Sequence, residues 1–174
     1  VVEPGGAVVR VRGLHHHDRP VEEVSRGQRA AINLAGIRHD ELHRGQVLAS
    51  PGSLVASRWL TVRFSLLPTA PRPLKNRDRV KVHLGAVETN ASVRLLGAHR
   101  LAPGDEALGQ LLLQEPAAAI WRQPLVLRTP SPAHTIGGAV VIDPEGQPLR
   151  RPDGATIAQV AQLGPMLDVI HENR

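Results

Sequence analysis

Residues 27–52 constrain the possible folds of this chain more than any other stretch, and they read GQRAAINLAGIRHDELHRGQVLASPG. Residues 28–34 are apolar and branched enough to form a buried strand, which the following Ala-Gly pair ends. Residues 40–42 are too few and too polar for a core helix, so we expect a single helical turn there. The Arg44-Gly45 pair stops this turn before a second strand over residues 46–49.

The remainder of the chain repeats short strand patterns that are separated by glycine and proline. Residues 59–67 alternate apolar with polar side chains, which predicts a half-buried strand. Further strands are predicted over residues 1–2, 7–14, 21–24, 79–84, 86–96, 107–113, 118–121, 125–128 and 135–142. Only 2% of the residues are aromatic, so the core must consist of valine, leucine, isoleucine and alanine. Short strands at this spacing predict an antiparallel barrel or sandwich.

The two ends of the chain differ from this pattern. Residues 148–154 resemble a charged linker, and residues 155–163 and 165–171 have the apolar spacing of helices, interrupted by Gly164 and Pro165. The first residues are typical of a strand that enters a Pro-Gly-Gly turn and not of a signal peptide. We therefore interpret the sequence as a fragment of a longer protein.

The charge of the chain is carried mainly by arginine. Twenty-one lysines and arginines against 16 acidic residues give a formal net charge of +5, and the only lysines are Lys75 and Lys81. Arginine binds phosphate through two parallel hydrogen bonds and stacks on bases, so RNA is a plausible partner. An arginine-favouring codon bias explains the composition equally well. The sequence contains no cysteine, which excludes disulfides and thiolate metal sites, and no apolar run long enough to span a bilayer.

Nine histidines raise the alternative of a metal-dependent hydrolase. Residues 15–17 are three adjacent histidines, but neighbours in an extended loop point in different directions, so we expect a solvated loop tip there. His39 and His43 have the spacing of two ligands on one helical face, but the sequence places no acidic or thiolate third ligand with them, so we expect a surface pair. No H-E-x-x-H or H-x-x-E-H cluster is present, so we expect neither a metal site nor a catalytic residue.

Two sets of motifs resemble translation factors. Gly27, Leu34, Gly36, Ile37, Arg44, Gly45, Val47, Leu48, Ala49, Pro51 and Gly52 match the end of the second barrel domain of the elongation factor Tu superfamily. Residues 83–96, 101–111 and 125–128, with Pro132 and residues 135–138, resemble the third domain of the selenocysteine-specific elongation factors. The resemblance covers residues 1 to about 147. The general aminoacyl-tRNA-carrying factor is the second interpretation.

This resemblance implies an all-β fold of two consecutive small antiparallel barrels with a short helical tail. The implied domains are a partial second domain over residues 1–54, the third domain over residues 55–147, and the start of the next domain over residues 148–174. No G-x-x-x-x-G-K-[ST] loop or Asn-Lys-x-Asp motif is present. GTP and Mg²⁺ would therefore belong to a GTPase domain before Val1. Winged-helix repeats that bind the selenocysteine-insertion mRNA hairpin would follow Arg174, in a cytoplasmic protein that acts on the ribosome.

The resemblance also implies two sites for selenocysteyl-tRNA. Arg29 would line the aminoacyl pocket, where a partly desolvated guanidinium pairs with the ionised selenol and rejects a seryl group. Lys81, Asn90 and the backbone at Thr135, Gly137 and Gly138 would face the tRNA stem, because such groups suit phosphate and 2′-hydroxyl recognition.

A different class of function remains open, in which two barrels only bridge other domains as a protein-interaction module. The fragment interpretation adds an expectation of its own. Strands missing before Val1 would leave an open barrel edge beside residues 7–14. Exposed strand edges recruit partners, so we expect a homodimer of the fragment through this edge.

Overall fold

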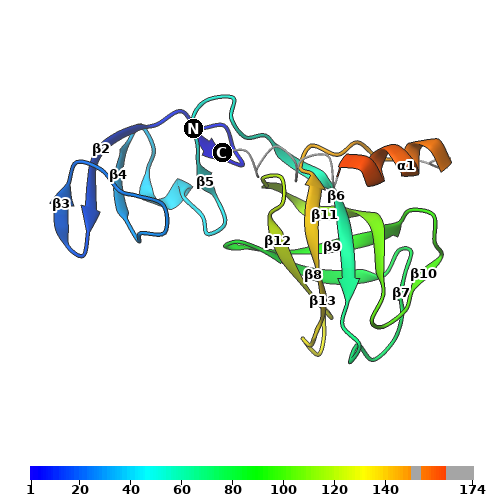
Figure 1. The fold of residues 1–174 in the computed structure, drawn as a ribbon. Helices are drawn as coiled ribbons and strands as arrows, with labels where there is room; N and C mark the ends of the chain where they lie inside the picture. The colour runs from blue at the N-terminus through cyan, green and yellow to red at the C-terminus, as the bar shows by residue number, and fades with distance from the viewer. Residues whose placement is uncertain (150–153, 164–174) are drawn as a thin grey trace.

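A computed structural model describes residues 1–149 and 154–163 of the chain (Figure 1). The predicted all-β class is confirmed, because strands form nearly all of the regular structure. The N-terminal part contains β1 (Val2–Glu3), β2 (Arg10–His16), β3 (Arg19–Val21), β4 (Ala31–Ala35), the 3₁₀ turn η1 (His39–Glu41) and β5 (Val47–Leu48). The second part contains β6 (Ala56–Leu66), β7 (Leu74–Lys75), β8 (Arg79–Leu84), β9 (Val87–Leu95), β10 (Arg100–Leu101), β11 (Glu106–Ala118), β12 (Pro124–Arg128) and β13 (Thr135–Asp143), followed by α1 (Gly154–Leu163).

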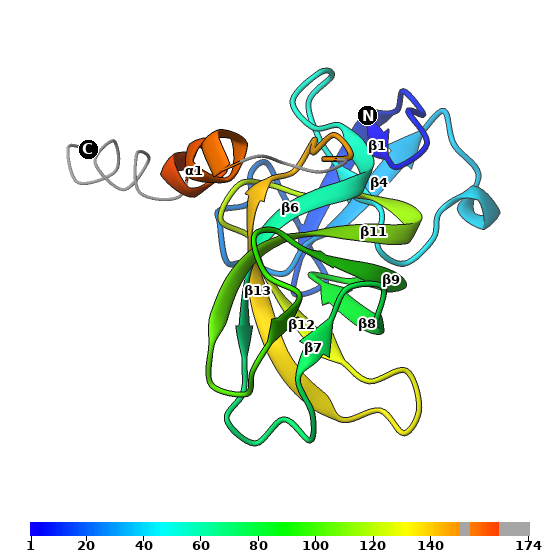
Figure 2. The same ribbon diagram turned by 90° about the vertical axis from the view of Figure 1, so that its right-hand side faces the viewer.

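A closed antiparallel barrel forms the second part, with the strand order β11-β6-β13-β12-β8-β9 (Figure 2). Its core is the aliphatic one that the composition predicts, with Phe64 as its one aromatic member among the described residues. Alternate residues of each strand point inward, so that Val80, Val82 and Leu84 of β8 are buried while the residues between them are not. The intervening residues are therefore held on the outer surface in a fixed order.

The barrel wall is close-packed at Gly109 of β11. A Cβ atom on this residue would lie 2.5 Å from both the carbonyl oxygen of Arg94 and a ring carbon of Phe64. No side chain fits at that distance, so only glycine lets β11 pair with its neighbours here.

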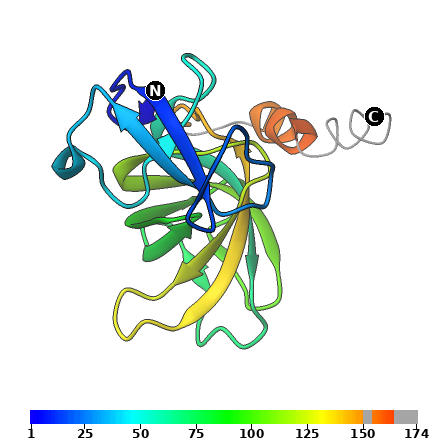
Figure 3. The ribbon, with the colours of Figure 1, turned by 90° about the vertical axis from the view of Figure 1, so that its left-hand side faces the viewer.

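The N-terminal part consists of a three-stranded sheet, β3-β2-β4, and the pair β1-β5 (Figure 3). These sheets do not close into a ring within the part of the chain that the structure describes. Residues 1–2 and 7–14, predicted as strands on either side of a Pro-Gly-Gly turn, share only one bridge, from Val2 to Ala7, because β1 pairs with β5 instead. Val8, Val11 and Ile32 remain exposed on this part, at 75%, 46% and 41%.

The expectation of an open edge along residues 7–14 is correct for only part of that segment. Strand β2 lies in the middle of its sheet, paired with β4 from Arg10 to His15 and with β3 from Leu14 to His16. On the side of β2 that faces away from β4, residues 10–13 pair with no strand among the described residues. The open edge is therefore shorter than the sequence suggested.

Several strand boundaries differ from those predicted. Strand β11 runs on through Pro116, where the sequence predicted a break, because a register shift against β6 between Leu112 and Ala117 accommodates the proline. Of residues 118–121, which were predicted as a separate strand, Ala118 ends β11 and the other three form a loop. The two-residue strands β7 and β10 were not predicted. The first tail helix is present as α1, whereas residues 165–171 lie outside the described residues.

The two parts meet where Gly45, in the loop before β5, packs against Val87 at the start of β9. A Cβ atom at Gly45 would lie 3.1 Å from the Cγ2 atom of Val87, and the backbone at Gly45 has a φ of 99°. This contact brings the N-terminal part next to the β8–β9 edge of the barrel. Across residues 1–149 and 154–163, no helix has the length and apolar character needed to cross a membrane.

Gly109→Ala is expected to destabilise the barrel by about 1–3 kcal/mol, because the added methyl group overpacks the wall against Phe64. Gly13→Ala is the control, since a Cβ atom there meets nothing within 4 Å. Urea unfolding followed by tryptophan fluorescence measures the difference, because both tryptophans, Trp59 and Trp121, belong to the second part. Equal stability of the two variants would contradict this account of the wall.

Candidate functional site

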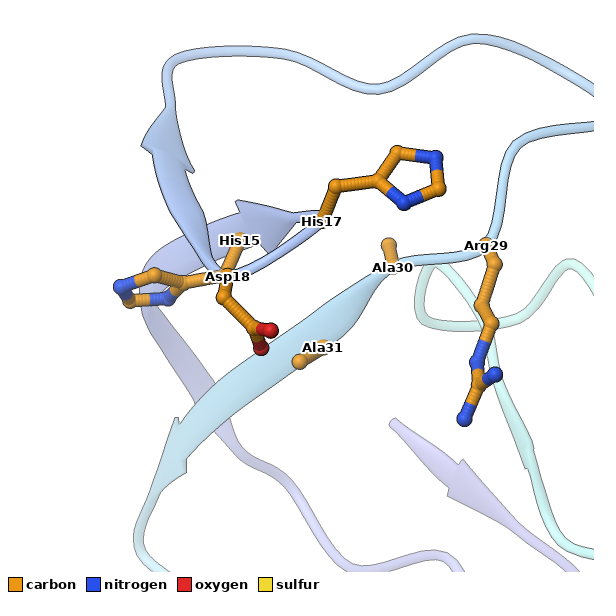
Figure 4. Close-up of a pocket in the computed structure, with 6 residues that line it drawn as sticks. All are labelled: His15, His17, Asp18, Arg29, Ala30 and Ala31. Atoms are coloured by element: carbon orange, nitrogen blue, oxygen red, sulfur yellow. The ribbon is translucent and has the colours of Figure 1, made fainter.

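Arg29 lies at the edge of a cavity of about 350 Å³ in the N-terminal part (Figure 4). It lies two residues before β4, and the cavity is also lined by residues of the turn between β2 and β3. That turn is tight because His17 and Asp18 adopt left-handed backbone conformations, with φ of 49° and 60°. The Nδ1 atom of His16 lies 2.7 Å from the carbonyl oxygen of Arg29. This hydrogen bond connects the end of β2 to the backbone at Arg29.

The Arg29 guanidinium makes no ion pair or hydrogen bond to any described residue. Figure 4 shows its side chain extending away from the imidazole of His17 and the carboxylate of Asp18. The side chain is exposed, whereas the sequence argument placed it in a partly desolvated pocket. Water must therefore be excluded from the Arg29 guanidinium by whatever binds over the cavity.

The sequence argument missed the other polar residues that line this cavity, which are His15, His17 and Asp18. It treated the three histidines as a loop tip, and only the tight turn shows that His15 and His17 line the same cavity as Arg29. The one available signal was the polar H-H-H-D-R run between two strand patterns. In the described ranges, no group of three histidine, aspartate or glutamate side chains is arranged to hold a metal ion.

The barrel brings three of the predicted stem-binding residues into one row across adjacent strands. Thr135 of β13 pairs with Arg128 of β12, Arg128 pairs with Lys81 of β8, and Lys81 pairs with Asn90 of β9. Asn90 then donates a hydrogen bond of 3.2 Å from Nδ2 to Oε1 of Gln114 on β11. We call these five residues the polar row. Sequence reasoning missed Arg128 and Gln114, because their places depend on register.

The two predicted glycines lie elsewhere. Gly137 pairs with Leu127 and Gly138 with Val126, and Gly137 is buried. A Cβ atom on Gly137 would overlap the carbonyl oxygen of Ser65 on β6. Strand packing therefore accounts for glycine at residue 137, and the structure does not bring it into the polar row.

Lys81 already has a partner within the chain. Its Nζ atom donates a hydrogen bond of 2.6 Å to Oε1 of Glu88, and Nδ1 of His83 lies 3.8 Å from the other carboxylate oxygen. The hydrogen bond from Lys81, and then its charge, lower the pKa of Glu88 below the ordinary value. Glu88 is thus ionised at neutral pH and partly neutralises Lys81.

A hollow of about 280 Å³ adjoins the polar row on the β8–β9–β11 side. Asn90 and Gln114 of the row line it together with Arg58 and Arg79, and no carboxylate is among its lining residues. Both arginines are exposed. We call this the basic hollow. Positive charge without an acidic counterpart favours binding of a polyanion.

Comparison with known proteins gives a consistent result. Residues 61–148 match the family described as "Selenocysteine-specific elongation factor, beta-barrel domain". The chain is 35% identical over 150 residues to the selenocysteine-specific elongation factor of Desulfomicrobium baculatum, a match that covers 86% of this chain and 24% of the relative. It is 39% identical over 99 residues to elongation factor Tu 2 of Streptomyces avermitilis, covering 55% and 25%.

The fold is similar to the crystal structure of a bacterial selenocysteine-specific elongation factor, EF-Sec. The TM-score is 0.76 at 26% sequence identity, and the match covers 94% of this chain and 25% of the other. The chain therefore spans about a quarter of the length of these relatives.

Replacing Lys81 by methionine is expected to raise the pKa of Glu88 toward the ordinary value of a glutamate, because both the hydrogen bond and the neighbouring charge are lost. An NMR titration of the carboxyl carbon measures this shift. Lys75→Met is the matched control, since Lys75 is the only other lysine in the sequence and lies on β7. A Glu88 pKa that is the same in all three proteins would contradict the pairing.

Proposed function

The chain belongs to the family of selenocysteine-specific elongation factors, and we propose that it provides the surface on which such a factor holds selenocysteyl-tRNA. The cavity at Arg29 would receive the aminoacyl end, and the polar row would hold the backbone of the stem. The observation that carries the proposal is a guanidinium at a cavity edge that forms no ion pair with any described residue, Asp18 of the same cavity included. GTP-dependent delivery to the ribosome, with GTP and Mg²⁺ in another domain and the mRNA hairpin on a further one, completes the proposed activity.

Selenium chemistry explains why an arginine suits the aminoacyl end. A selenol is largely ionised at neutral pH, and a charged hydrogen bond to a guanidinium contributes roughly 1.5–3 kcal/mol once water is excluded. A seryl group carries no charge, so it would leave the covered guanidinium desolvated and unpaired. One residue would thereby favour the correct amino acid and disfavour its precursor.

The polar row and the basic hollow suit the tRNA stem for a different reason. Arg128 and Lys81 offer positive charge to phosphates, and Thr135, Asn90 and Gln114 offer hydrogen bonds to 2′-hydroxyl groups. An A-form helix is recognised mainly through such backbone contacts, without reading bases. Glu88 has to release Lys81 for its charge to act fully on a phosphate.

A general aminoacyl-tRNA carrier is the second candidate, since identity to an elongation factor Tu reaches 39%. The two candidates differ in what Arg29 does. A general carrier would accept seryl and selenocysteyl ends alike, and the residue would be one exposed arginine among many.

Arg29→Ala is expected to weaken binding of selenocysteyl-tRNA by about tenfold to a hundredfold, the equivalent of one charged hydrogen bond. The measurement uses the full-length protein that the fragment interpretation implies, loaded with GTP, and compares selenocysteyl-tRNA with seryl-tRNA. Arg29→Lys keeps the charge and should fall between the variant and the wild type.

Arg26→Ala is the control, because Arg26 is exposed three residues away and does not line the cavity. Equal losses for the two charged tRNAs, or an equal loss in the control, would rule out the selenocysteine pocket. Equal binding of the two tRNAs by the wild type would favour the general carrier.

Lys81→Met should reduce the salt dependence of tRNA binding, lowering the slope of log affinity against log salt by about one if one phosphate contact is lost. Lys75→Met removes the same charge from β7, away from the polar row, and should leave the slope nearly unchanged. Titration of tRNA that carries no amino acid, at several salt concentrations, gives both slopes. A similar change in the two variants would mean that only net charge matters.

A further inference from the structure

A second hollow of about 280 Å³ lies on the outer barrel surface beyond the basic hollow, with Ser92 and Leu112 lining both. Trp59, Asn76, Arg77 and Arg94 also line it, and no carboxylate does. We propose that this hollow binds one unpaired nucleotide of an RNA, with the base stacked on the Arg94–Trp59 pair and the phosphate at Arg77. The site goes beyond the proposed aminoacyl-tRNA surface and does not depend on recognition of the amino acid.

Arg94 is held in place before any ligand arrives. Its guanidinium carbon lies 5.0 Å from the centre of the Trp59 ring, and Nη1 donates a hydrogen bond of 3.0 Å to the carbonyl oxygen of Leu149. A guanidinium fixed over an indole presents a flat, positively charged surface on which bases stack. Because the geometry exists already, binding loses little side-chain entropy.

The segment that holds Arg94 is itself fixed by one buried side chain. Gln110 is fully buried, and its Oε1 accepts a hydrogen bond of 2.9 Å from the backbone N–H of Leu149. Its Nε2 donates one of 2.8 Å to the carbonyl oxygen of Gln147. The amide thus pairs with residues 147–149 as a neighbouring strand would, and this strap keeps the Leu149 oxygen where Arg94 needs it.

Arg77 is positioned in a way that stability alone does not favour. Its backbone has a φ of 69°, a left-handed conformation that costs a side-chain-bearing residue roughly 1 kcal/mol or more. Its guanidinium makes no ion pair or hydrogen bond within residues 1–149 and 154–163. The adjacent carboxylate of Asp78 binds Arg72 at 2.7 Å and the backbone N–H of Lys75 at 2.9 Å, both through Oδ2, and forms no ion pair with Arg77. Arg77 therefore has no ion pair among the described residues to break when an external anion binds.

The remaining polar groups determine the class of ligand. Asn76 accepts a hydrogen bond of 2.6 Å from the Leu95 backbone at Oδ1, which leaves its amide nitrogen as a donor beside Arg77. The lining thus combines donors, two guanidinium groups and an indole, and it contains no anion. A planar aromatic ligand that carries negative charge satisfies all of these groups, and a nucleotide is such a ligand. The volume is that of a small-ligand site, too small for a duplex.

Tryptophan fluorescence tests this site on the 174-residue chain itself. In a Trp121→Phe background Trp59 is the only tryptophan, so its quenching reports stacking in the hollow. A short oligouridylate should quench the emission saturably. A base-free ribose-phosphate oligomer of the same charge should have an affinity at least about fivefold lower, because base stacking contributes roughly 1–3 kcal/mol to binding.

Arg77→Gly separates binding from folding, because glycine relieves the left-handed backbone while removing the guanidinium. This variant should be at least as stable as its parent and should lose about fivefold or more in affinity for oligouridylate, as expected for one phosphate contact. Arg63→Ala is the charge-matched control, since Arg63 is exposed on β6 and does not line the hollow.

Three results would overturn the proposal: no saturable quenching, equal binding of the base-free oligomer, or equal losses in the Arg77 and Arg63 variants. The last two would reduce the hollow to a general electrostatic surface. No aminoacylated tRNA enters these measurements, so failure here leaves the test at Arg29 unaffected. A failure at Arg29 likewise leaves this site standing.

Discussion

Closure of the six-stranded ring is the constraint on which the rest of the structure depends. Every strand of the ring is hydrogen-bonded on both sides, so no strand can slip without breaking two ladders. A slip of one residue would also turn the buried valines and leucines outward. The fixed register carries Thr135, Arg128 and Lys81 from three different strands to adjacent positions. The surface chemistry of the barrel is therefore a by-product of how its core closes.

The basic residues fall into two groups with different physical meaning. Lys81 and Arg72 form ion pairs with carboxylates of this chain, so an incoming anion has to compete with Glu88 or Asp78. Arg29 and Arg77 have no such partner among the described residues. Exposed ion pairs are weak, so the competition is modest, but it separates groups that are ready to bind from groups that must first be released.

The sequence predicted what depends on local pattern and failed where distant residues decide. Residues 79–84 were predicted as a strand with the bounds that β8 has, because its alternation of valine with polar residues is unambiguous. Pro116 misled the prediction, because a register shift against another strand absorbs it. Arg29 was singled out through family resemblance, whereas His17, Asp18, Arg128 and Gln114 were missed because turn geometry and cross-strand register bring them to their sites. The polar H-H-H-D-R run was the one local signal for His17 and Asp18, and cross-strand register leaves no local signal for Arg128 and Gln114.

The pairing of Gln110 with residues 147–149 has a mechanical consequence. The two amide hydrogen bonds are partly buried, with Gln110 fully enclosed at one end, and Gly146 packs closely on Thr61 beside them. A pull applied to the chain directly after Leu149 would load these bonds and the Arg94 contact before it reached the barrel strands. Residues 147–149 thus take up tension where the chain leaves the barrel, and such tension would disturb the hydrogen bond that holds Arg94 over Trp59.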